Sequence, residues 1–542
     1  MTSKNHSPPN QQTDGRRMAL VFIALVVATL LAYIPATQCG YIWDDDDYVT
    51  ENETLKTADG LRRIWFEIGA THQYYPLVHT TYWIEYQMWG LSPMGYHVTN
   101  ILLHAIAAFL LGVLLERLKV PGGWLAAAMF AVHPVHVESV AWITERKNTL
   151  SAVFYLSSAI AFFRFAKSDD SPKDPKQWRW YALSLVLFCC ALFSKTVTVT
   201  LPAAILLVRW WQNGAVTRRD VALVAPMLVI AVPLGLITVW VETHLIGTSK
   251  IDLGLSPLDR LLVAGRAVWF YALKLVWPYK LTFIYPRWQV SAFVWWQYLF
   301  PLAFFATCFV LWSQRQRFGH GPLAAVLFFA GTLTPALGFV DVYPMRFSFV
   351  ADHFQYLASI GIIVLMAGIL VAAADKLKGS NQRSVFLIAS PVLMCFGLLT
   401  WFQCYVYKDV ETLWRDTAGK NPGAMIAHVN LGLELHEQGR IQAAIESFTK
   451  AIEAEPSAET YFCRAMAYKF DEDYERAFGD FATVIRMAPN HDEAYVQRGM
   501  LFELHGDLES ALADYGNAVK LNNMNHRALH FWTRVLKELE QD

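Results

Sequence analysis

The sequence predicts an all-α protein, in which a polytopic membrane unit of about eleven spanning helices precedes a small domain of helical repeats. Three observations support this prediction. Only 17% of the 542 residues are charged, against roughly 25% in soluble domains, and the mean hydropathy is +0.28. Apolar runs long enough to span a bilayer recur as far as residue 405. Beyond residue 421 the hydropathy falls, and a repeat with spacings of 33 and 34 residues begins.

The composition excludes several classes of function. The net charge is −1, and no block of basic residues indicates nucleic-acid binding. Acidic residues exceed basic ones by roughly ten from residue 409 onward, so the preceding part is basic by a similar amount. The 7 cysteines are scattered, without the spacing of a disulfide framework or a metal site.

The membrane unit is predicted to extend over residues 18–408, after a polar segment, residues 1–17, that we expect to be disordered. A spanning helix needs about 20 mostly apolar residues. The predicted spans are residues 18–38, 96–115, 123–142, 149–166, 179–194, 196–212, 221–241, 292–312, 322–340, 356–374 and 384–405.

Short basic segments set the predicted orientation, because basic loops favour the cytoplasmic side. They are residues 16–17, 116–119, 167–179, 218–219, 315–317 and 376–383. If the N-terminus is cytoplasmic, all of them fall on that side, and the odd number of spans places the C-terminus outside. Residues 261–278 are apolar but contain Arg266 and Lys274, and a full span there would turn the basic loop 315–317 outward. We therefore expect an interfacial or re-entrant helix on the outer face.

Residues 424–525 contain three repeats, each with a small residue, an alanine and an aromatic residue at equivalent positions. These are Gly432, Ala465 and Gly499; Ala444, Ala477 and Ala511; and Phe448, Phe481 and Tyr515. This register is that of tetratricopeptide repeats (TPRs), which have two antiparallel helices per unit. Residues 409–423 are predicted to be a linker, and residues 526–542 a capping helix. The groove of such an array is expected to bind a peptide or a partner protein, and a simple packing module is the alternative.

Acidic groups on the outer face are candidates for chemistry. Residues 44–47 are all aspartate and follow the first span, in an outer loop of residues 39–95. Their mutual repulsion predicts a raised pKa for at least one carboxyl, which suits a general base or a metal ligand. A solvated acidic turn is the alternative. Glu138 would lie about 22 Å into the third span, near the outer edge of the hydrocarbon, where an ionisable group suggests either function or a structural pair.

Basic groups are also predicted on the outer face, against the usual preference for the cytoplasmic side, so they require an anionic partner. Arg146 and Lys147 lie between the third and fourth spans, and Lys195 lies between the fifth and sixth. His353 precedes the tenth span. A base beside cations at a membrane surface suits a lipid-phosphate sugar donor, because the base deprotonates an acceptor hydroxyl and the cations stabilise the departing phosphate.

Several passages resemble bacterial TPR-bearing membrane glycosyltransferases and their eukaryotic relatives, the TMTC family of protein O-mannosyltransferases. The passages are residues 41–52 (YIWDDDDYVTEN), 75–77 (YPL), 96–104 (YHVTNILLH), 133–142 (HPVHVESVAW), 145–148 (ERKN), 194–196 (SKT) and 351–357 (ADHFQYL). The resemblance covers nearly the whole chain. It implies a GT-C fold and a polyprenyl- or dolichyl-phosphate sugar as the donor.

The resemblance also implies roles for particular residues. The catalytic acidic pair would be Asp44 and Asp45, with Glu138 as the second acidic position, and Arg146 would contact the donor phosphate. The sequence departs from the family at His353, where relatives usually carry arginine. This departure argues against a fixed phosphate contact at that position, because histidine is only partly charged near neutral pH. It also has Lys195-Thr196 where bacterial relatives often have Lys-Pro. Some GT-C enzymes use a divalent metal and the protein O-mannosyltransferase branch does not, so no metal ligand is predicted and metal dependence is left open.

The predicted function is transfer of a hexose, expected to be mannose, from a polyprenyl phosphate to Ser or Thr hydroxyls of exported proteins, with the acceptor in the TPR groove. The donor phosphate would be held by Arg146, Lys147, Lys195 and His353. A lipid or glycan acceptor, with TPRs that only recruit a partner, is one alternative, and a non-catalytic TPR scaffold is another. We expect a bacterial inner membrane with periplasmic TPRs, or the ER lumen in a eukaryote.

Overall fold

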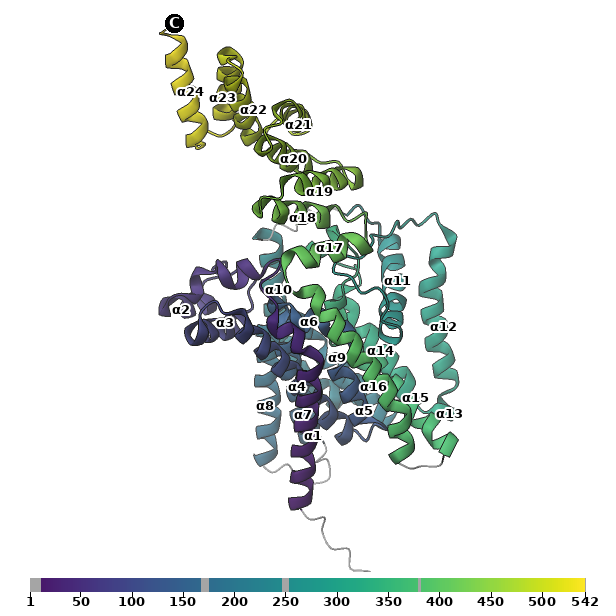
Figure 1. Cartoon of the computed structure of the whole chain (residues 1–542). Coiled ribbons are helices and arrows are strands. Elements are labelled where there is room, and N and C mark those ends of the chain that lie inside the picture. Colours follow the sequence, from purple (N-terminus) through teal and green to yellow (C-terminus); the bar gives the residue numbers. More distant parts are fainter. Residues whose placement is uncertain (1–10, 167–174, 246–252, 379–381, 542) are drawn as a thin grey trace, which may run out of the picture. The chain divides into compact units, whose positions relative to one another are not determined.

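The computed structural model describes residues 11–166, 175–245, 253–378 and 382–541 (Figure 1). Every regular element in these ranges is a helix, which confirms the all-α class. The chain forms two compact units, Met1–Phe283 with Arg287–Asp409, and Ile284–Pro286 with Val410–Asp542. We call the first the membrane unit and the second the repeat unit.

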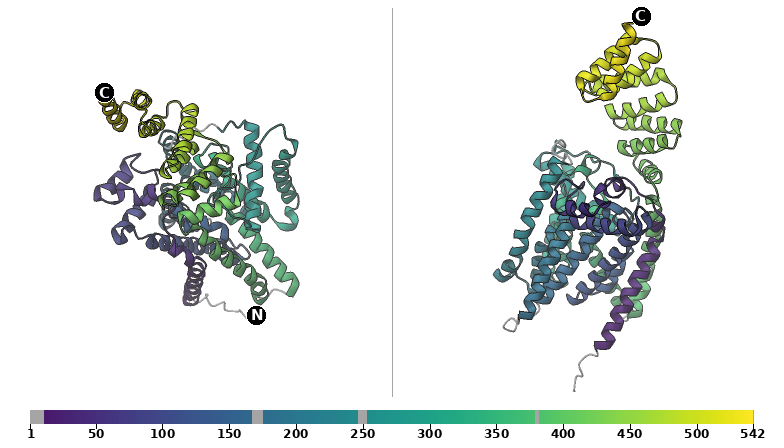
Figure 2. Two further views of the ribbon diagram at one scale, coloured as in Figure 1. Left: turned by 45° about the horizontal axis from the view of Figure 1, so that its top comes forward. Right: turned by 90° about the vertical axis from the view of Figure 1, so that its left-hand side faces the viewer.

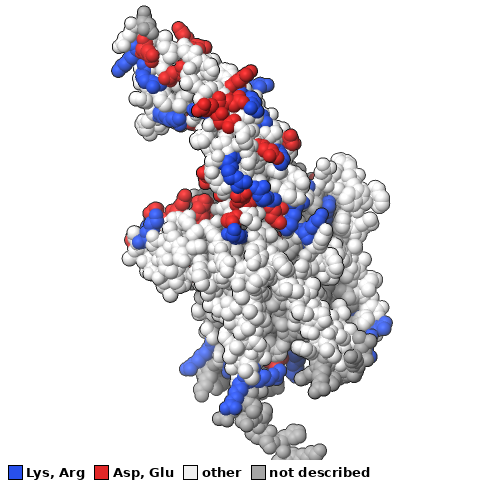
Figure 3. Space-filling model, in the orientation of Figure 1, with Lys and Arg blue, Asp and Glu red and all other residues white. Residues whose placement is uncertain are grey.

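The membrane unit combines long helices with several short ones. Its helices are α1 (Gln11–Tyr33), α2 (Ala58–Phe66), α3 (Pro76–Trp89), α4 (Pro93–Arg117), α5 (Gly123–Ala131), α6 (Val137–Ala141), α7 (Arg146–Ala166), α8 (Pro175–Ser194), α9 (Leu201–Asn213), α10 (Arg218–His244), α11 (Pro257–Val276), α12 (Leu299–Ser313), α13 (Arg315–Phe318), α14 (Gly321–Leu333), α15 (Ser359–Lys378) and α16 (Gln382–Cys404). On the face shown in Figure 3, charged side chains of this unit gather at its two ends and leave an uncharged belt between them. This distribution is typical of a protein in a bilayer.

Seven helical stretches of the described residues are long and apolar enough to cross a membrane, so the chain is a multi-pass membrane protein. They correspond to the predicted spans that begin at residues 18, 96, 149, 221, 292, 356 and 384. The predicted spans 179–194, 196–212 and 322–340 form α8, α9 and α14, which are not among the seven. α11, where we expected an interfacial or re-entrant helix, is not among them either, and it packs against α12 and α15.

The prediction of one continuous span over residues 123–142 is wrong. α5 ends at Ala131, and a 3₁₀ turn over Pro134–His136 leads into the short helix α6. Proline has no N–H to donate and disfavours a helical conformation in the preceding residue, and His133 is accordingly extended, with ψ 126°. The depth of Glu138 that we predicted from an unbroken helix is therefore wrong as well.

The first span and the last span meet at the same end of the membrane unit. Gly40, just after the first span, donates its N–H to the carbonyl of Lys408 at 2.8 Å. The chain therefore leaves the membrane unit at the end that carries the loop of residues 39–95, which we call the loop end. At the opposite end Arg17 lies 3.5 Å from Glu116, and we call this the basic end. Of the segment predicted to be disordered, residues 1–10 lie outside the described ranges, and α1 already begins at Gln11.

The repeat unit is a stack of antiparallel helix pairs (Figure 2). The pairs are α18 (Met425–Glu437) with α19 (Ile441–Ala454), α20 (Ala458–Phe470) with α21 (Tyr474–Met487), and α22 (Asp492–Leu504) with α23 (Leu508–Leu521). The predicted capping helix forms α24 (His526–Leu539), and its Ala528 and Val535 are buried. The predicted linker instead contains a helix, α17 (Val410–Lys420), because Leu413 and Trp414 are buried in the unit.

Close approach of the paired helices explains the small residues of the repeat. A Cβ atom added at Gly432 would lie 2.5 Å from the ring of Phe448, and one added at Gly499 would lie 2.8 Å from the ring of Tyr515. The middle repeat has Ala465 at this position, packed without any exposed area. The aromatic residue of each second helix thus occupies the space that the small residue of the first helix leaves free.

Candidate active site

A short turn between α6 and α7 carries charged residues at the loop end. Trp142 is extended, with ψ 119°, a 3₁₀ turn covers Ile143–Glu145, and α7 begins at Arg146. We call residues 142–148 the charged turn. All of its side chains are buried, so each charge must find a partner within the protein.

Asp45 ties the acidic loop to the charged turn. Its Oδ1 accepts hydrogen bonds from the N–H of Thr144 at 2.9 Å and from the Thr144 hydroxyl at 2.7 Å. Its Oδ2 accepts from the N–H of Ile42 at 2.9 Å. Burial raises the pKa of Asp45 to about 7, and the hydrogen bonds oppose part of the rise. With both oxygens occupied, Asp45 is placed to hold the loop.

One carboxylate oxygen of Asp44, Oδ1, is available to accept a hydrogen bond. The side chain is half-buried, and among the described residues none hydrogen-bonds to its enclosed Oδ1. Burial raises the pKa of Asp44 to about 8, Lys147 opposes the rise, and Asp45 adds to it. The raised pKa that we predicted for the aspartate run is therefore present, but its main cause is burial and not the repulsion that we invoked.

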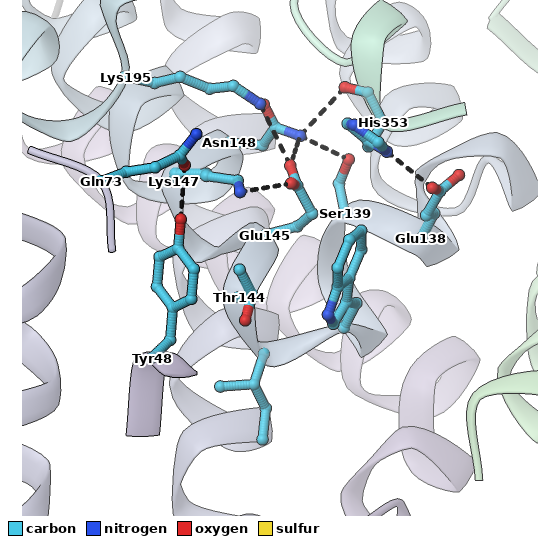
Figure 4. A network of polar contacts seen from close by, with 12 residues as sticks. Tyr48, Gln73, Glu138, Ser139, Thr144, Glu145, Lys147, Asn148, Lys195 and His353 are labelled. Carbon is cyan, nitrogen blue, oxygen red and sulfur yellow. Dashed lines mark hydrogen bonds and ion pairs between the residues drawn. The ribbon is translucent and has the colours of Figure 1, made fainter. Parts of the chain in front are cut away.

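Glu145 is the centre of a buried charged cluster (Figure 4). Its Oε1 lies 3.0 Å from Nζ of Lys147, and its Oε2 lies 3.2 Å from Nζ of Lys195. Asn148 bridges the group, because its Nδ2 donates to Oε2 of Glu145 at 2.5 Å and its Oδ1 accepts from Lys195 at 2.8 Å. Two ammonium groups thus share the carboxylate of Glu145, and the carboxylates of Asp44 and Glu138 also act electrostatically on Lys147 and Lys195, respectively.

The Lys147 ammonium also lies against aromatic faces. It is 5.2 Å from the ring centroid of Tyr48 and 5.9 Å from that of Trp142. A polar chain continues from Tyr48, whose hydroxyl donates to Gln73 at 2.5 Å, and Gln73 in turn donates to Glu242 at 2.8 Å. The lysine is therefore held in place by its surroundings on more than one side.

His353 and Glu138 form a second buried pair beside this cluster (Figure 4). Nδ1 of His353 donates to Oε1 of Glu138 at 2.7 Å, and none of the described residues hydrogen-bonds to the buried Oε2 of Glu138. The backbone carbonyl of His353 accepts from Asn148 at 3.0 Å, which joins the pair to the charged cluster.

Arg146 lies apart from these groups. Its guanidinium has no exposed area and pairs with Glu85, while its Nε donates to Asn100 at 2.8 Å. Further N–H groups reach the carbonyl of Tyr96 at 2.8 Å and the hydroxyl of Thr81 at 3.2 Å. These bonds occupy most of its donors, so the geometry favours a structural role over the predicted contact with donor phosphate.

The structure thus brings together Lys147, Lys195, Asp44 and the pair of Glu138 with His353. The sequence prediction of the site omitted Glu145 and Asn148, although both stand in the quoted ERKN passage, and their position on either side of two basic residues was the available signal. Nothing in the sequence pointed to Gln73 or Glu242, because their partners are distant in the chain. Across the described ranges, no three His, Cys, Asp or Glu side chains are grouped as ligands for a metal ion.

Comparison with known proteins supports both units. Family models described as tetratricopeptide repeat match residues 427–457 and 464–523, which confirms the predicted TPRs. The chain is 28% identical over 223 residues to Protein O-mannosyl-transferase Tmtc3 of Drosophila melanogaster, covering 34% of this chain and 24% of that protein. It is 24% identical over 491 residues to Protein O-mannosyl-transferase TMTC4 of Mus musculus, covering 78% of this chain and 64% of that protein. The chain therefore spans less than two thirds of either relative.

Among solved structures, ArnT from Cupriavidus metallidurans bound to undecaprenyl phosphate has a TM-score of 0.37 and 15% identity. The match covers 88% of this chain and 80% of ArnT. The sequence relationships and the repeats define a TPR-containing membrane protein. It is distantly related to the TMTC protein O-mannosyl-transferases, as the resemblance in the sequence predicted.

Proposed function

We propose that the protein is a GT-C-type membrane glycosyltransferase that moves a hexose, expected to be mannose, from a polyprenyl-phosphate sugar to Ser or Thr hydroxyls of exported proteins. One observation carries the proposal. Lys147 and Lys195 share the carboxylate of Glu145, and Asp44, which lies in the electrostatic field of Lys147, keeps an oxygen to which none of the described residues hydrogen-bonds. The distant relationship to proteins named protein O-mannosyl-transferase supports the same reaction.

In this reaction Oδ1 of Asp44 accepts the proton of the acceptor hydroxyl. The hydroxyl oxygen forms a bond to the anomeric carbon of the sugar, and the bond from that carbon to the phosphate oxygen breaks. The electron pair stays on the phosphate, so the product polyprenyl phosphate carries one more negative charge than the donor. Asp44 becomes neutral at the same time, and the net effect is movement of one negative charge from the base to the leaving group.

The lysine pair stabilises this charge movement. Glu145 holds both ammonium groups and Asn148 also holds that of Lys195, so they need little reorganisation when the phosphate gains charge. The phosphate of the bound donor carries less charge than the departing phosphate, so the pair binds the transition state more strongly than the ground state. Glu138 and His353 lie on the other side of Asn148, where His353 is proposed as a further contact for the donor.

The test measures transfer from radiolabelled polyprenyl-phosphate mannose to protein in membranes that contain the wild type, Asp44→Asn or Asp47→Asn. Asp44→Asn should slow transfer roughly 100- to 10,000-fold, because the amide cannot accept the proton. Asp47 is exposed in the same loop and is the matched control, which should keep the wild-type rate. Full transfer by Asp44→Asn would remove this carboxylate from the mechanism. If the wild type transfers no sugar from any of a panel of lipid-linked donors, the proposal that the protein is a glycosyltransferase is contradicted.

The acceptor is proposed to bind the repeat unit. Removal of residues 410–542 should then abolish transfer to protein while turnover or binding of the donor persists. Undiminished transfer after this deletion would favour the alternative of a lipid or glycan acceptor.

A further inference from the structure

Two buried polar groups beside the charged cluster have no hydrogen-bond partner among the described residues, and the proposed chemistry uses neither of them. They are the indole N–H of Trp142 and the Oε2 atom of Glu138. Trp142 is 5% exposed and Glu138 is 2% exposed, so bulk water does not surround either group. A buried polar atom without a partner destabilises the folded protein, so two such atoms beside a reaction site indicate a group that binds there.

The two groups belong to the two ends of the short helix α6. Glu138 lies in its first turn, and Trp142 directly follows its last residue, Ala141. Residues four apart on a helix carry Cβ atoms roughly 5–6 Å apart, so both side chains leave α6 on the same side. Both also contact His353, whose Nδ1 donates to Oε1 of Glu138 at 2.7 Å and whose ring centroid lies 5.8 Å from that of Trp142. The unpartnered oxygen and the unpartnered N–H therefore adjoin the same imidazole.

The groups proposed to hold the donor phosphate lie next to this pair (Figure 4). Nζ of Lys147 is 5.9 Å from the ring centroid of Trp142. The side chains of Lys147, Lys195 and His353 are 10%, 15% and 10% exposed, so a ligand can reach them from solvent. A group that is attached to a phosphate at these side chains would come to lie beside Trp142 and Glu138.

The hydrogen-bonding character of the two groups selects the chemistry of the ligand. An indole N–H only donates, and a carboxylate oxygen only accepts. A phosphate oxygen could accept from Trp142, but the carboxylate of Glu138 would repel it, and an isoprenoid chain would bond to neither group. A hydroxyl both donates and accepts, so the hydroxyls of one sugar ring can satisfy both groups.

We propose that Trp142 and Glu138 form the subsite that binds hydroxyls of the donor sugar, an inference that rests on the proposed function. The N–H of Trp142 donates to one hydroxyl oxygen, and Oε2 of Glu138 accepts from a hydroxyl of the same ring. His353 positions Glu138 through its bond to Oε1. The subsite discriminates between sugars by their hydroxyls, because a sugar that lacks one of them leaves a buried group without a partner.

A test combines substitution of Trp142 with removal of single hydroxyls from the donor. Trp142→Phe removes the N–H and keeps an aromatic ring, and the donors are undecaprenyl-phosphate mannose and each of its monodeoxy analogues. Trp142→Phe should lower kcat/KM for the mannosyl donor roughly tenfold, the effect of one lost hydrogen bond. It should have no effect with the analogue that lacks the bonded hydroxyl, because that analogue has already lost the same hydrogen bond.

Two further variants complete this test. Trp124 on α5 also has an indole N–H without a partner in the described part of the chain, but it follows Glu116 of the basic end by a few residues. Trp124→Phe is therefore the matched control and should keep the wild-type kcat/KM with every donor. Glu138→Gln keeps the shape of the side chain and removes its charge, and its cost should disappear with one of the monodeoxy donors. An equal cost of Trp142→Phe or Glu138→Gln on every donor would overturn the inference, as would no cost of Trp142→Phe on any donor.

A binding measurement separates this inference from the proposed function. In the purified full-length protein, Trp142→Phe should weaken binding of undecaprenyl-phosphate mannose roughly tenfold and leave the affinity for undecaprenyl phosphate, which carries no sugar, unchanged. This result in a protein that transfers no sugar would retain the sugar subsite and contradict the glycosyltransferase. Transfer by the wild type, together with an equal loss of affinity for both lipids in Trp142→Phe, would retain the glycosyltransferase and overturn the sugar subsite.

Discussion

Asp44 and Asp45 are neighbours in the chain, yet their carboxylates have different surroundings. Asp45 points to Thr144 and Ile42 and has both oxygens occupied. Asp44 faces the electrostatic field of Lys147 and keeps an oxygen without a hydrogen-bond partner among the described residues. The resemblance to the TMTC family implied that Asp44 and Asp45 act together as one catalytic acidic pair. We therefore propose Asp44 as the base and Asp45 as the residue that positions the loop.

The burial of Asp44 predicts a pH dependence. Its pKa is about 8, so the basic form that accepts a proton increases as pH rises toward 8, and the rate of transfer should rise over the same interval and then level off. Stability should change in the opposite direction. Between pH 4 and 8 the folded protein holds this proton while the unfolded chain has lost it, so the free energy of unfolding falls as pH rises.

Transfer rate and thermal unfolding, measured from about pH 5 to pH 9, check both trends. Asp44→Asn does not titrate, so its stability should fall less over this range than that of the wild type. Identical pH profiles of stability in the two proteins would contradict the assignment of the raised pKa to Asp44.

Arg146 and Lys195 should differ when each is replaced by methionine. Arg146→Met leaves Glu85 buried without its cation and should lower the free energy of unfolding by about 3–5 kcal/mol. Lys195→Met leaves Glu145 paired with Lys147, so stability should fall less while KM for the donor rises. Unfolding curves and donor KM values separate the two effects. A folded Arg146→Met protein with wild-type stability and weakened donor binding would support the predicted contact of Arg146 with the donor phosphate.

At the scale of elements, the break between α5 and α6 builds the site. The extended conformation before Pro134 ends α5, and the extended Trp142 ends α6, so that α7 can begin at Arg146. The charged turn can then point Glu145 and Lys147 inward while α6 directs Glu138 toward His353. A continuous helix would place residues 138 and 145 on a regular spiral, two turns apart.

The helix pairs of the repeat unit support a prediction with a matched control. Gly432→Val places a side chain where the ring of Phe448 lies at 2.5 Å and should destabilise the repeat unit by about 1–3 kcal/mol. Gly479 lies on an exposed part of α21, with nothing within 4 Å of an added Cβ. Gly479→Ala should instead stabilise the unit by roughly 0.4–1 kcal/mol, because it restricts the unfolded chain. Thermal unfolding of the repeat unit measures both, and a neutral Gly432→Val would contradict the close approach.

At the scale of the whole molecule, the meeting of the first and last spans at the loop end predicts that the first loop and the repeat unit lie on the same side of the membrane. Glu53 and Glu459 are both exposed, and a single cysteine that replaces either of them should react with a membrane-impermeant maleimide from the same side of the membrane. A cysteine at Arg218, in a basic segment that we predict to be cytoplasmic, should react only after permeabilisation. Reaction of the Glu53 and Glu459 positions from opposite sides would contradict this topology.

The sequence by itself determined the all-α class, the multi-pass membrane unit and the TPR repeats. These follow from local quantities, because hydropathy over about 20 residues identifies a span, and small residues in fixed register identify a repeat. The sequence also identified Lys147, Lys195 and Asp44 as candidates, since charged groups predicted next to a membrane surface stand out against an apolar background.

Only the tertiary structure decided which of these residues act together. Arg146 and Lys147 are adjacent in sequence, but successive residues of a helix point in different directions, so one faces Glu85 and the other Glu145. The partners of the cluster are separated in the chain, as with Glu145 and Lys195 or Glu138 and His353. Their contacts depend on how α6, α7, α8 and the segment before α15 pack, and no local pattern of residues encodes that packing.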